Sequence, residues 1–268
     1  MKAIVQDRYG TVDALELREI DRPQVGDHEV LVRVHAAGVD PGVWHLMTGL
    51  PYLIRIAGYG FRAPKSPVRG NDLAGRVEAV GKDVKQFEVG DEVFGTADGT
   101  FAEYVSAKAT NLAPKPANLS FEQAAAVPTS ALTALQGLRD HGEAQPGQRV
   151  LIIGASGGIG TFAVQLAKAF GTEATGVCST TKVDMVRSLG ADHVIDYLRD
   201  DFTTTAQRYD LILDMAGNRS LSRLRRALTH SGTLVIIGGE EGGRWLGGTD
   251  RQIRALLLSP FLQQSLRN

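Results

Sequence analysis

The chain has a single cysteine, Cys178, among its 268 residues. One thiol cannot form an internal disulfide bond, and it cannot supply a zinc site that needs two or more thiolates. Scarce cysteine is typical of proteins from a reducing compartment, so we expect a cytoplasmic protein.

Long apolar runs are lacking as well. The first ten residues, MKAIVQDRYG, do not combine a basic region with a long apolar stretch as a secretory signal does. No segment approaches the roughly 18 consecutive apolar residues of a membrane helix. The sequence therefore predicts neither a cleaved signal nor a membrane span.

An excess of either charge is also missing. Lys and Arg number 29 and Asp and Glu number 30, which gives a formal net charge of −1. Proteins that bind nucleic acid or an anionic membrane usually carry clustered basic residues in excess, so we expect neither partner. Hydrophobic residues make up 43% of the chain, enough for the core of one or two globular domains.

The pattern of the sequence changes near residue 120. Residues 1–119 contain short alternating segments separated by Gly, Pro and Asp, which predicts a β-rich domain built as a small barrel. Ser120, with Gln123 three residues later, predicts a capping box at the start of a helix. Pro128 should interrupt that helical segment. We place the boundary between two domains at residues 119 and 120.

Residues 120–268 alternate between expected strands and expected helices. The strands are 149–155, 173–179, 193–197, 209–217 and 233–239, and the helices between them are 159–171, 182–190 and 220–232. The strands are almost continuously apolar, as in a parallel sheet that is covered on both faces. The expected fold class is α/β, with a doubly wound parallel sheet in the second domain.

The segment VLIIGASGGIG, residues 150–160, joins the first of these strands to its helix. Aligned on Gly160, the dinucleotide-binding pattern G-x-G-x-x-G places Ala155, Gly157 and Gly160 in its three positions. A glycine at position 157 lets backbone N–H groups approach a pyrophosphate at the start of a helix. The alternative is a tight turn that binds nothing. The residues expected to contact a dinucleotide here are Ala155, Ser156, Gly157, Gly158 and Ile159.

The end of the next strand indicates which dinucleotide is bound. NAD sites usually have an acidic residue there, about 20 residues after the glycines, whereas this chain has GVCSTTK. Ser179, Thr180 and Lys182 can bind a 2′-phosphate through hydroxyl donors and an ammonium group. We therefore expect NADP rather than NAD as the cofactor. The alternative is that Thr180 or Thr181 caps the following helix.

The order of these parts resembles the medium-chain dehydrogenase/reductase superfamily, specifically its zinc-free quinone oxidoreductase branch. The segments that carry the resemblance are 36–49, 70–95, 101–105, 131–135, 154–171 and 188–197. It implies a GroES-like catalytic domain over residues 1–119, a Rossmann NADP-binding domain over 120–268, and a substrate cleft between them.

Zinc-dependent members of the superfamily have a cysteine after an AAG motif and a histidine in a Gly-His-Glu motif. This chain reads AAGVDP and GNDLAG at those places, with Asn71 in the position of the histidine. His45 and Asp40 alone are fewer than the three protein ligands of a catalytic zinc site. We expect no bound metal.

Without a metal, the resemblance implies that the protein positions NADPH to give its hydride to a quinone or an α,β-unsaturated carbonyl. Asp40 stands where relatives usually have Asn, near nicotinamide and substrate. Tyr52 is our candidate for lining the cleft or relaying a proton, although an apolar loop packed on the barrel would explain it equally. The cofactor contacts carried over by position are Thr129, Tyr197 and Gly238.

Two further expectations follow from the resemblance. Some zinc-free relatives resemble structural or regulatory proteins that bind NADPH with little turnover, so that function stays open as an alternative. Relatives also continue beyond the position of Asn268 with another strand of the Rossmann sheet, so the C-terminal part of the family fold is expected to be absent here. A homodimer is expected where that segment is present.

Overall fold

The structure is a computed structural model that describes residues 1–239 and 243–268. The chain forms two compact units, unit 1 (Met1–Thr129) and unit 2 (Ser130–Asn268). This division lies ten residues after the domain boundary expected from the sequence, because helix α2 (Phe121–Ala125) packs on the sheet of unit 1. Within the described ranges, no helix is long and apolar enough to cross a membrane.

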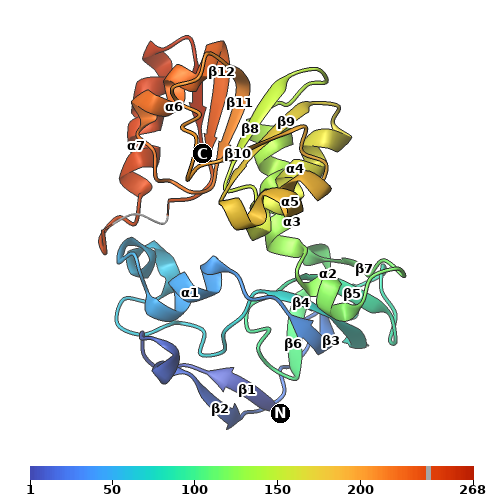
Figure 1. Ribbon diagram of the computed structural model, residues 1–268. Helices are drawn as coiled ribbons and strands as arrows, with labels where there is room; N and C mark the ends of the chain where they lie inside the picture. Colours follow the sequence, from blue (N-terminus) through green and yellow to red (C-terminus); the bar gives the residue numbers. More distant parts are fainter. Residues whose placement is uncertain (240–242) are drawn as a thin grey trace. The chain divides into compact units, whose positions relative to one another are not determined.

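Unit 1 contains two antiparallel sheets (Figure 1). The smaller pairs β1 (Lys2–Val5) with β2 (Glu16–Glu19). The larger runs in the order β6 (Tyr104–Lys108), β3 (Glu29–Ala37), β4 (Asp72–Val80), β5 (Glu92–Thr96) and β7 (Leu112–Pro114). The described strands of this larger sheet form an open sheet, with β6 and β7 at its edges, within the β-rich domain that the sequence predicts. The edge strand β7 is only three residues long and ends in Pro114, which has no N–H to donate.

Alternation along the strands of unit 1 builds its core, as the sequence predicts. Val30, Val32, Leu73, Val77 and Val93 are all fully or almost fully buried in one cluster. Helix α1 (Pro41–Thr48) follows β3, and the capping box of Ser120 and Gln123 is present at the start of α2. Short helical turns occupy Val12–Ala14, Arg55–Tyr59 and Ala109–Asn111.

Unit 2 is a parallel sheet of six strands with helices on both faces. The strand order is β10 (His193–Asp196), β9 (Glu173–Cys178), β8 (Arg149–Ile153), β11 (Tyr209–Asp214), β12 (Leu228–Ile236) and β13 (Ser265–Arg267). The helices are α3 (Pro128–Gln136), which begins in unit 1, α4 (Gly158–Ala169), α5 (Val183–Ser188), α6 (Leu221–Ala227) and α7 (Thr249–Leu258). Shorter turns occupy Gly137–His141, Thr180–Lys182 and Ser259–Phe261.

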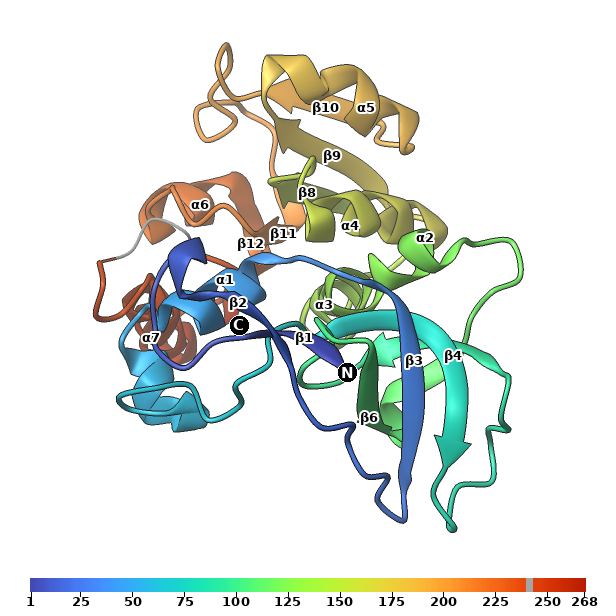
Figure 2. The same ribbon diagram turned by 90° about the horizontal axis from the view of Figure 1, so that it is seen from below.

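The strands of unit 2 contribute to two cores in alternation. Val150 and Ile152 of β8 pack with residues of α4 and α5, whereas Leu151 and Ile153 pack with residues of α6 and α7. Figure 2 shows the two pairs of helices on opposite faces of the sheet. The doubly wound arrangement predicted from the apolar strands is confirmed.

Two details of unit 2 differ from the sequence-based expectation. The predicted helix over 220–232 ends at Ala227, because Leu228 already pairs with Tyr209 as the first residue of β12 and is buried there. In addition, the C-terminal residues form β13 beside β12. The sheet thus has one strand more than the five expected.

Candidate cofactor site

The turn between β8 and α4 begins at Gly154. This residue has φ of +88°, a conformation that glycine adopts without strain. Its carbonyl accepts a hydrogen bond of 3.0 Å from the N–H of Gly157, which closes the turn. Our alignment placed the first glycine position of the fingerprint at Ala155, and the structure shows that the residue before it makes the turn.

Gly157 and Gly160 differ in how closely the rest of the protein surrounds them. A Cβ atom on Gly160 would lie 2.1 Å from the carbonyl oxygen of Gly154, so only glycine allows α4 to pack this closely on the turn. A Cβ on Gly157 would meet its nearest protein atom at 3.5 Å, an ordinary contact. The protein's own packing therefore does not require glycine at position 157. Gly157 is exposed and is the N-cap of α4, where it leaves the backbone open to an anion.

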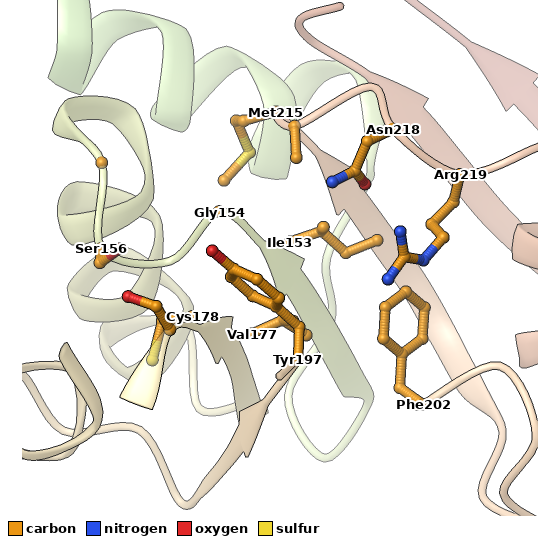
Figure 3. A pocket seen from close by; sticks show the side chains of 13 residues that line it. Ile153, Gly154, Ser156, Val177, Cys178, Tyr197, Phe202, Met215, Asn218 and Arg219 are labelled. Atoms are coloured by element: carbon orange, nitrogen blue, oxygen red, sulfur yellow. The ribbon is translucent and has the colours of Figure 1, made fainter. Parts of the chain in front are cut away.

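A cavity of about 310 Å³ lies at the carboxyl ends of the central strands of unit 2 (Figure 3). It spans the ends of β8 and β11, between which the strand order reverses, and open α/β sheets bind ligands at such a switch point. Its lining residues are Ile153, Gly154, Ser156, Gly157, Val177, Cys178, Ser179, Tyr197, Phe202, Met215, Ala216, Asn218 and Arg219.

Four residues predicted from the sequence line this cavity together: Ser156, Gly157, Ser179 and Tyr197. The backbone N–H of Tyr197 donates to the carbonyl of Cys178 over 3.1 Å, which fixes the start of its segment beside β9. The residue is 46% exposed, and Figure 3 shows the phenol group pointing toward the turn that contains Gly154 and Ser156.

Other predicted residues of unit 2 lie outside the cavity lining. Ala155 is fully buried, and its N–H donates to Val177 over 3.0 Å. Ile159 packs on the core under α4, and Gly158 lies beside the hydroxyl of Ser130. Gly238 follows β12 and donates its N–H to Asp214 over 3.3 Å.

Thr180 makes a contact that the sequence analysis did not anticipate. Its hydroxyl donates to Oδ2 of Asp196 over 2.5 Å, and this hydrogen bond lowers the pKa of that carboxyl group. Thr180 therefore does not cap α5, and its hydroxyl proton is already used. Lys182 is exposed, and its ammonium group has no hydrogen bond or ion pair to any residue that the structure describes.

The sequence analysis missed the wall of the cavity that follows β11. Met215, Asn218 and Arg219 lie there, and Arg219 has a buried Nε atom without a hydrogen-bond partner in the described part of the chain. Figure 3 shows its guanidinium group beside the ring of Phe202. The sequence did contain a signal for this wall. The segment DLILD belongs to β11, which pairs in parallel with β8, so the loops after both strands lie at the same edge of the sheet.

Thr129 belongs to a hydrogen-bonded cluster in unit 1. Its N–H donates to Oδ2 of Asp72 over 3.0 Å and its hydroxyl donates to Oδ1 over 2.5 Å, while Asn71 donates to the Thr129 hydroxyl over 3.0 Å. Asp72 is only 3% exposed, and burial raises the pKa of its carboxyl group. Coulombic repulsion from Asp40 raises this pKa further.

The two candidate catalytic residues have structural contacts of their own. Asp40 is the N-cap of α1, where its Oδ1 accepts from Gly42 over 2.6 Å and from Val43 over 3.2 Å. Its Oδ2 atom is buried without a hydrogen-bond partner among the described residues. The ring of Tyr52 lies 4.8 Å from the guanidinium carbon of Arg55.

The side chains at the expected zinc position do not suit a zinc ion. Asn71 uses its amide to donate to Thr129 and Asp72, and an amide nitrogen is not a zinc ligand. Over residues 1–239 and 243–268, no three His, Cys, Asp or Glu side chains gather as a metal site requires.

Comparison with known proteins adds two family matches, one in each unit. Residues 26–117 match the alcohol dehydrogenase GroES-like domain family, and residues 158–255 match the family described as zinc-binding dehydrogenase. The name of the second family mentions zinc, but its match covers residues 158–255 in unit 2. Asn71 and the side chains that do not suit zinc lie in unit 1, outside that match.

Individual relatives agree with these matches. The quinone oxidoreductase of Homo sapiens is 33% identical over 249 residues, covering 89% of this chain and 73% of the relative. The chloroplastic NADPH-dependent alkenal/one oxidoreductase of Arabidopsis thaliana is 34% identical over 255 residues, covering 89% and 63%. The solved structure of Escherichia coli quinone oxidoreductase complexed with NADPH has a TM-score of 0.82 and 26% identity, covering 100% of this chain and 81% of that one.

The GroES-like unit and the Rossmann unit together define a two-domain dehydrogenase/reductase. The chain belongs to the medium-chain dehydrogenase/reductase superfamily, in its quinone oxidoreductase-like branch. It is shorter than its relatives and spans only 60% to 62% of the length of several of them. Some relatives are mitochondrial or chloroplastic by name.

Proposed function

We propose that this protein transfers a hydride from NADPH to a quinone or an α,β-unsaturated carbonyl without a metal ion. The observation that carries the proposal is the exposed backbone of Gly157 at the N-terminus of α4, within a cavity at the switch point of a parallel sheet. The names of two relatives, a quinone oxidoreductase and an NADPH-dependent alkenal/one oxidoreductase, support the substrate class.

Different residues of unit 2 would bind different parts of the cofactor. Backbone N–H groups from Gly157 to Ile159 would bind the pyrophosphate, because the helix N-terminus attracts negative charge. Ser179 and Tyr197 would contact the adenosine half, and the unpartnered ammonium of Lys182 would bind the 2′-phosphate. Thr180 would act through Asp196 rather than directly.

Two other residues, Gly238 and Thr129, are proposed as cofactor contacts because they occupy the positions of such contacts in the family. Gly238 lies where β12 ends, on the same edge of the sheet as the turn, and Thr129 is held by Asp72. When bound, NADPH supplies the hydride.

Asp40 and Tyr52 would contact the substrate. Two backbone amides already donate to Oδ1 of Asp40, so its Oδ2, which has no hydrogen-bond partner among the described residues, would be the atom that contacts the substrate. The hydroxyl of Tyr52 remains as the candidate donor of the proton that reduction of a carbonyl or quinone oxygen requires.

A single assay series tests this function. Purified protein is titrated with NADPH and then supplied with a benzoquinone, an enone, an enal and, as a control, a saturated ketone. We expect NADPH to be oxidised with the conjugated acceptors and not with the ketone, because conjugation delocalises the charge that arrives with the hydride. Binding without turnover would instead favour the alternative, a structural or regulatory NADPH-binding protein. Absence of binding would contradict both. A cytoplasmic location and a homodimer stay predictions.

A further inference from the structure

Unit 1 contains a second cavity, which the proposed function does not use. It has a volume of about 210 Å³ and lies between α1, the segment 58–70 and the loop 98–99. We call it the Arg69 cavity. Its lining includes Val43, Leu46, Tyr59, Val68, Arg69 and Asp98, and all its lining residues belong to unit 1.

Arg69 is a buried cation without a matching anion. The residue is 6% exposed, and burial lowers the pKa of its guanidinium group. One terminal nitrogen donates to the carbonyl of Ser66, whereas Nε is buried and has no hydrogen-bond partner. In residues 1–239 and 243–268, no carboxylate lies within ion-pair distance of Arg69, and Asp98 attracts its charge only from farther away. Arginine stays charged in proteins, and an unpaired buried charge is costly.

The backbone holds Arg69 in place at this cavity. Its N–H donates to Ile4 over 3.3 Å, and its carbonyl accepts from Phe101 over 2.9 Å, so the residue is tied to chain segments on both sides. The next residue, Gly70, has φ of +95° and no room for a side chain. The buried charge, which has no ion-pair partner among the described residues, is therefore a fixed feature of the fold.

The other walls of the Arg69 cavity are mainly apolar. Val43 and Leu46 come from α1, and Val68 comes from the segment before β4. Two charged side chains, Lys65 and Asp98, also line it, and both are exposed. Together with Arg69 these groups carry one net positive charge. The lining thus combines a buried cation whose Nε lacks an acceptor with a surface suited to hydrocarbon.

We propose that the Arg69 cavity binds a small monocarboxylic acid, with the carboxylate on the guanidinium of Arg69 and the apolar body against Val43, Leu46 and Val68. Guanidinium groups pair with carboxylates through charge-assisted hydrogen bonds. The volume equals that of roughly seven water molecules, which suits a ligand about the size of benzoate.

Benzoate is the probe that tests the proposal. The buried Nε–H of Arg69 is followed by ¹H–¹⁵N NMR in the 268-residue chain while sodium benzoate is added at constant ionic strength. Benzyl alcohol, sodium chloride and sodium phosphate are added in parallel. We expect a saturable shift of this signal with benzoate, with at least tenfold weaker responses to the other three.

Variants locate the site. In a variant that lacks the Arg69 Nε–H, the methyl NMR signals of Val43 and Val68 report benzoate binding instead. Arg69→Met should weaken benzoate binding at least tenfold, whereas Arg76→Met, which removes an exposed arginine of β4, should leave it unchanged. Leu46→Phe keeps Arg69 and fills the cavity from α1, so it should weaken binding tenfold even if Arg69→Met fails to fold.

Charge at the rim gives an independent measurement. Asp98→Asn removes the one negative charge of the lining and should tighten benzoate binding by about threefold to tenfold at low salt. Equal responses to benzoate and benzyl alcohol would overturn the proposal, as would responses to chloride or phosphate that match benzoate. A signal of Arg69 that no probe moves would also overturn it. The experiment uses no NADPH, so its outcome is separate from that of the proposed function.

Discussion

The hydroxyl of Thr129 donates to one oxygen of the Asp72 carboxylate over 2.5 Å while its N–H donates to the other over 3.0 Å. A single residue at the end of unit 1 thus satisfies both oxygens of a buried acid in β4. We expect Thr129→Val to lower the free energy of unfolding by about 1–3 kcal/mol, because the buried carboxyl group of Asp72 loses a hydrogen-bond donor. Urea titration measures this, with the exposed Thr110→Val as the control. Equal stability of both variants would contradict it.

Burial of Asp72 also predicts how stability varies with pH. Its pKa is raised in the folded protein, so the folded state binds the proton more tightly than the unfolded state does. Stability therefore falls as the pH rises from the unfolded pKa of about 3.9 to the raised value, and then levels off. Asp72→Asn should lack this decline. Urea titrations of both proteins between about pH 4 and 8 would contradict the assignment if their difference stayed constant.

The two glycines of the turn should separate stability from binding. Gly160→Ala places a methyl group 2.1 Å from the Gly154 oxygen and should cost about 1–3 kcal/mol of stability or more. Gly157→Ala meets no such clash, so its stability should change by less than about 1 kcal/mol. Its affinity for NADPH should nevertheless fall at least tenfold, because the methyl group stands where the pyrophosphate would approach. Thermal unfolding and calorimetric titration distinguish the two effects, and unchanged affinity would remove Gly157 from the site.

Lys182 should determine the preference for NADPH. Lys182→Ala is expected to weaken NADPH binding by about 1.5–3 kcal/mol, roughly ten- to a hundredfold, and to leave NADH binding nearly unchanged. Arg187→Ala removes a positive charge from α5, where Arg187 pairs with Asp184, and serves as the control. Direct binding titrations of both cofactors decide the point. Equal affinities of the unmutated protein for NADPH and NADH would refute the assignment.

Metal content is the remaining test. Because the amide group of Asn71 donates hydrogen bonds to Thr129 and Asp72, we expect no stoichiometric zinc in purified protein after dialysis. Elemental analysis measures this directly. One zinc ion per chain after dialysis would contradict both the metal-free reaction and our interpretation of Asn71.

Local signals in the sequence predicted much of the fold. The apolar run of β8, the glycines after it and the period of α4 agree with one another, so each supported the same interpretation. Residues 228–232 were predicted less well, because Leu228 is buried by pairing with Tyr209, which is distant in the sequence. The open sheet of unit 1 was also hard to predict, because its form depends on which strands distant in the sequence pair with each other.

The residues that line the candidate site could be identified only in part from the sequence, for a related reason. Ser156, Gly157, Ser179 and Tyr197 follow strands that the pattern identified, and they line one cavity. The partner of Thr180 could not be predicted, because Asp196 reaches it only through the pairing of β9 with β10.

The alternation along β8 has a consequence for how substitutions combine. Val150 and Ile152 belong to one core and Leu151 and Ile153 to the other, although all four are neighbours in the chain. Two volume changes in the same core alter a shared set of helix contacts, and their energetic costs should couple. Two changes in opposite cores should be closer to additive, so pairs one residue apart in β8 should be more independent than pairs two residues apart.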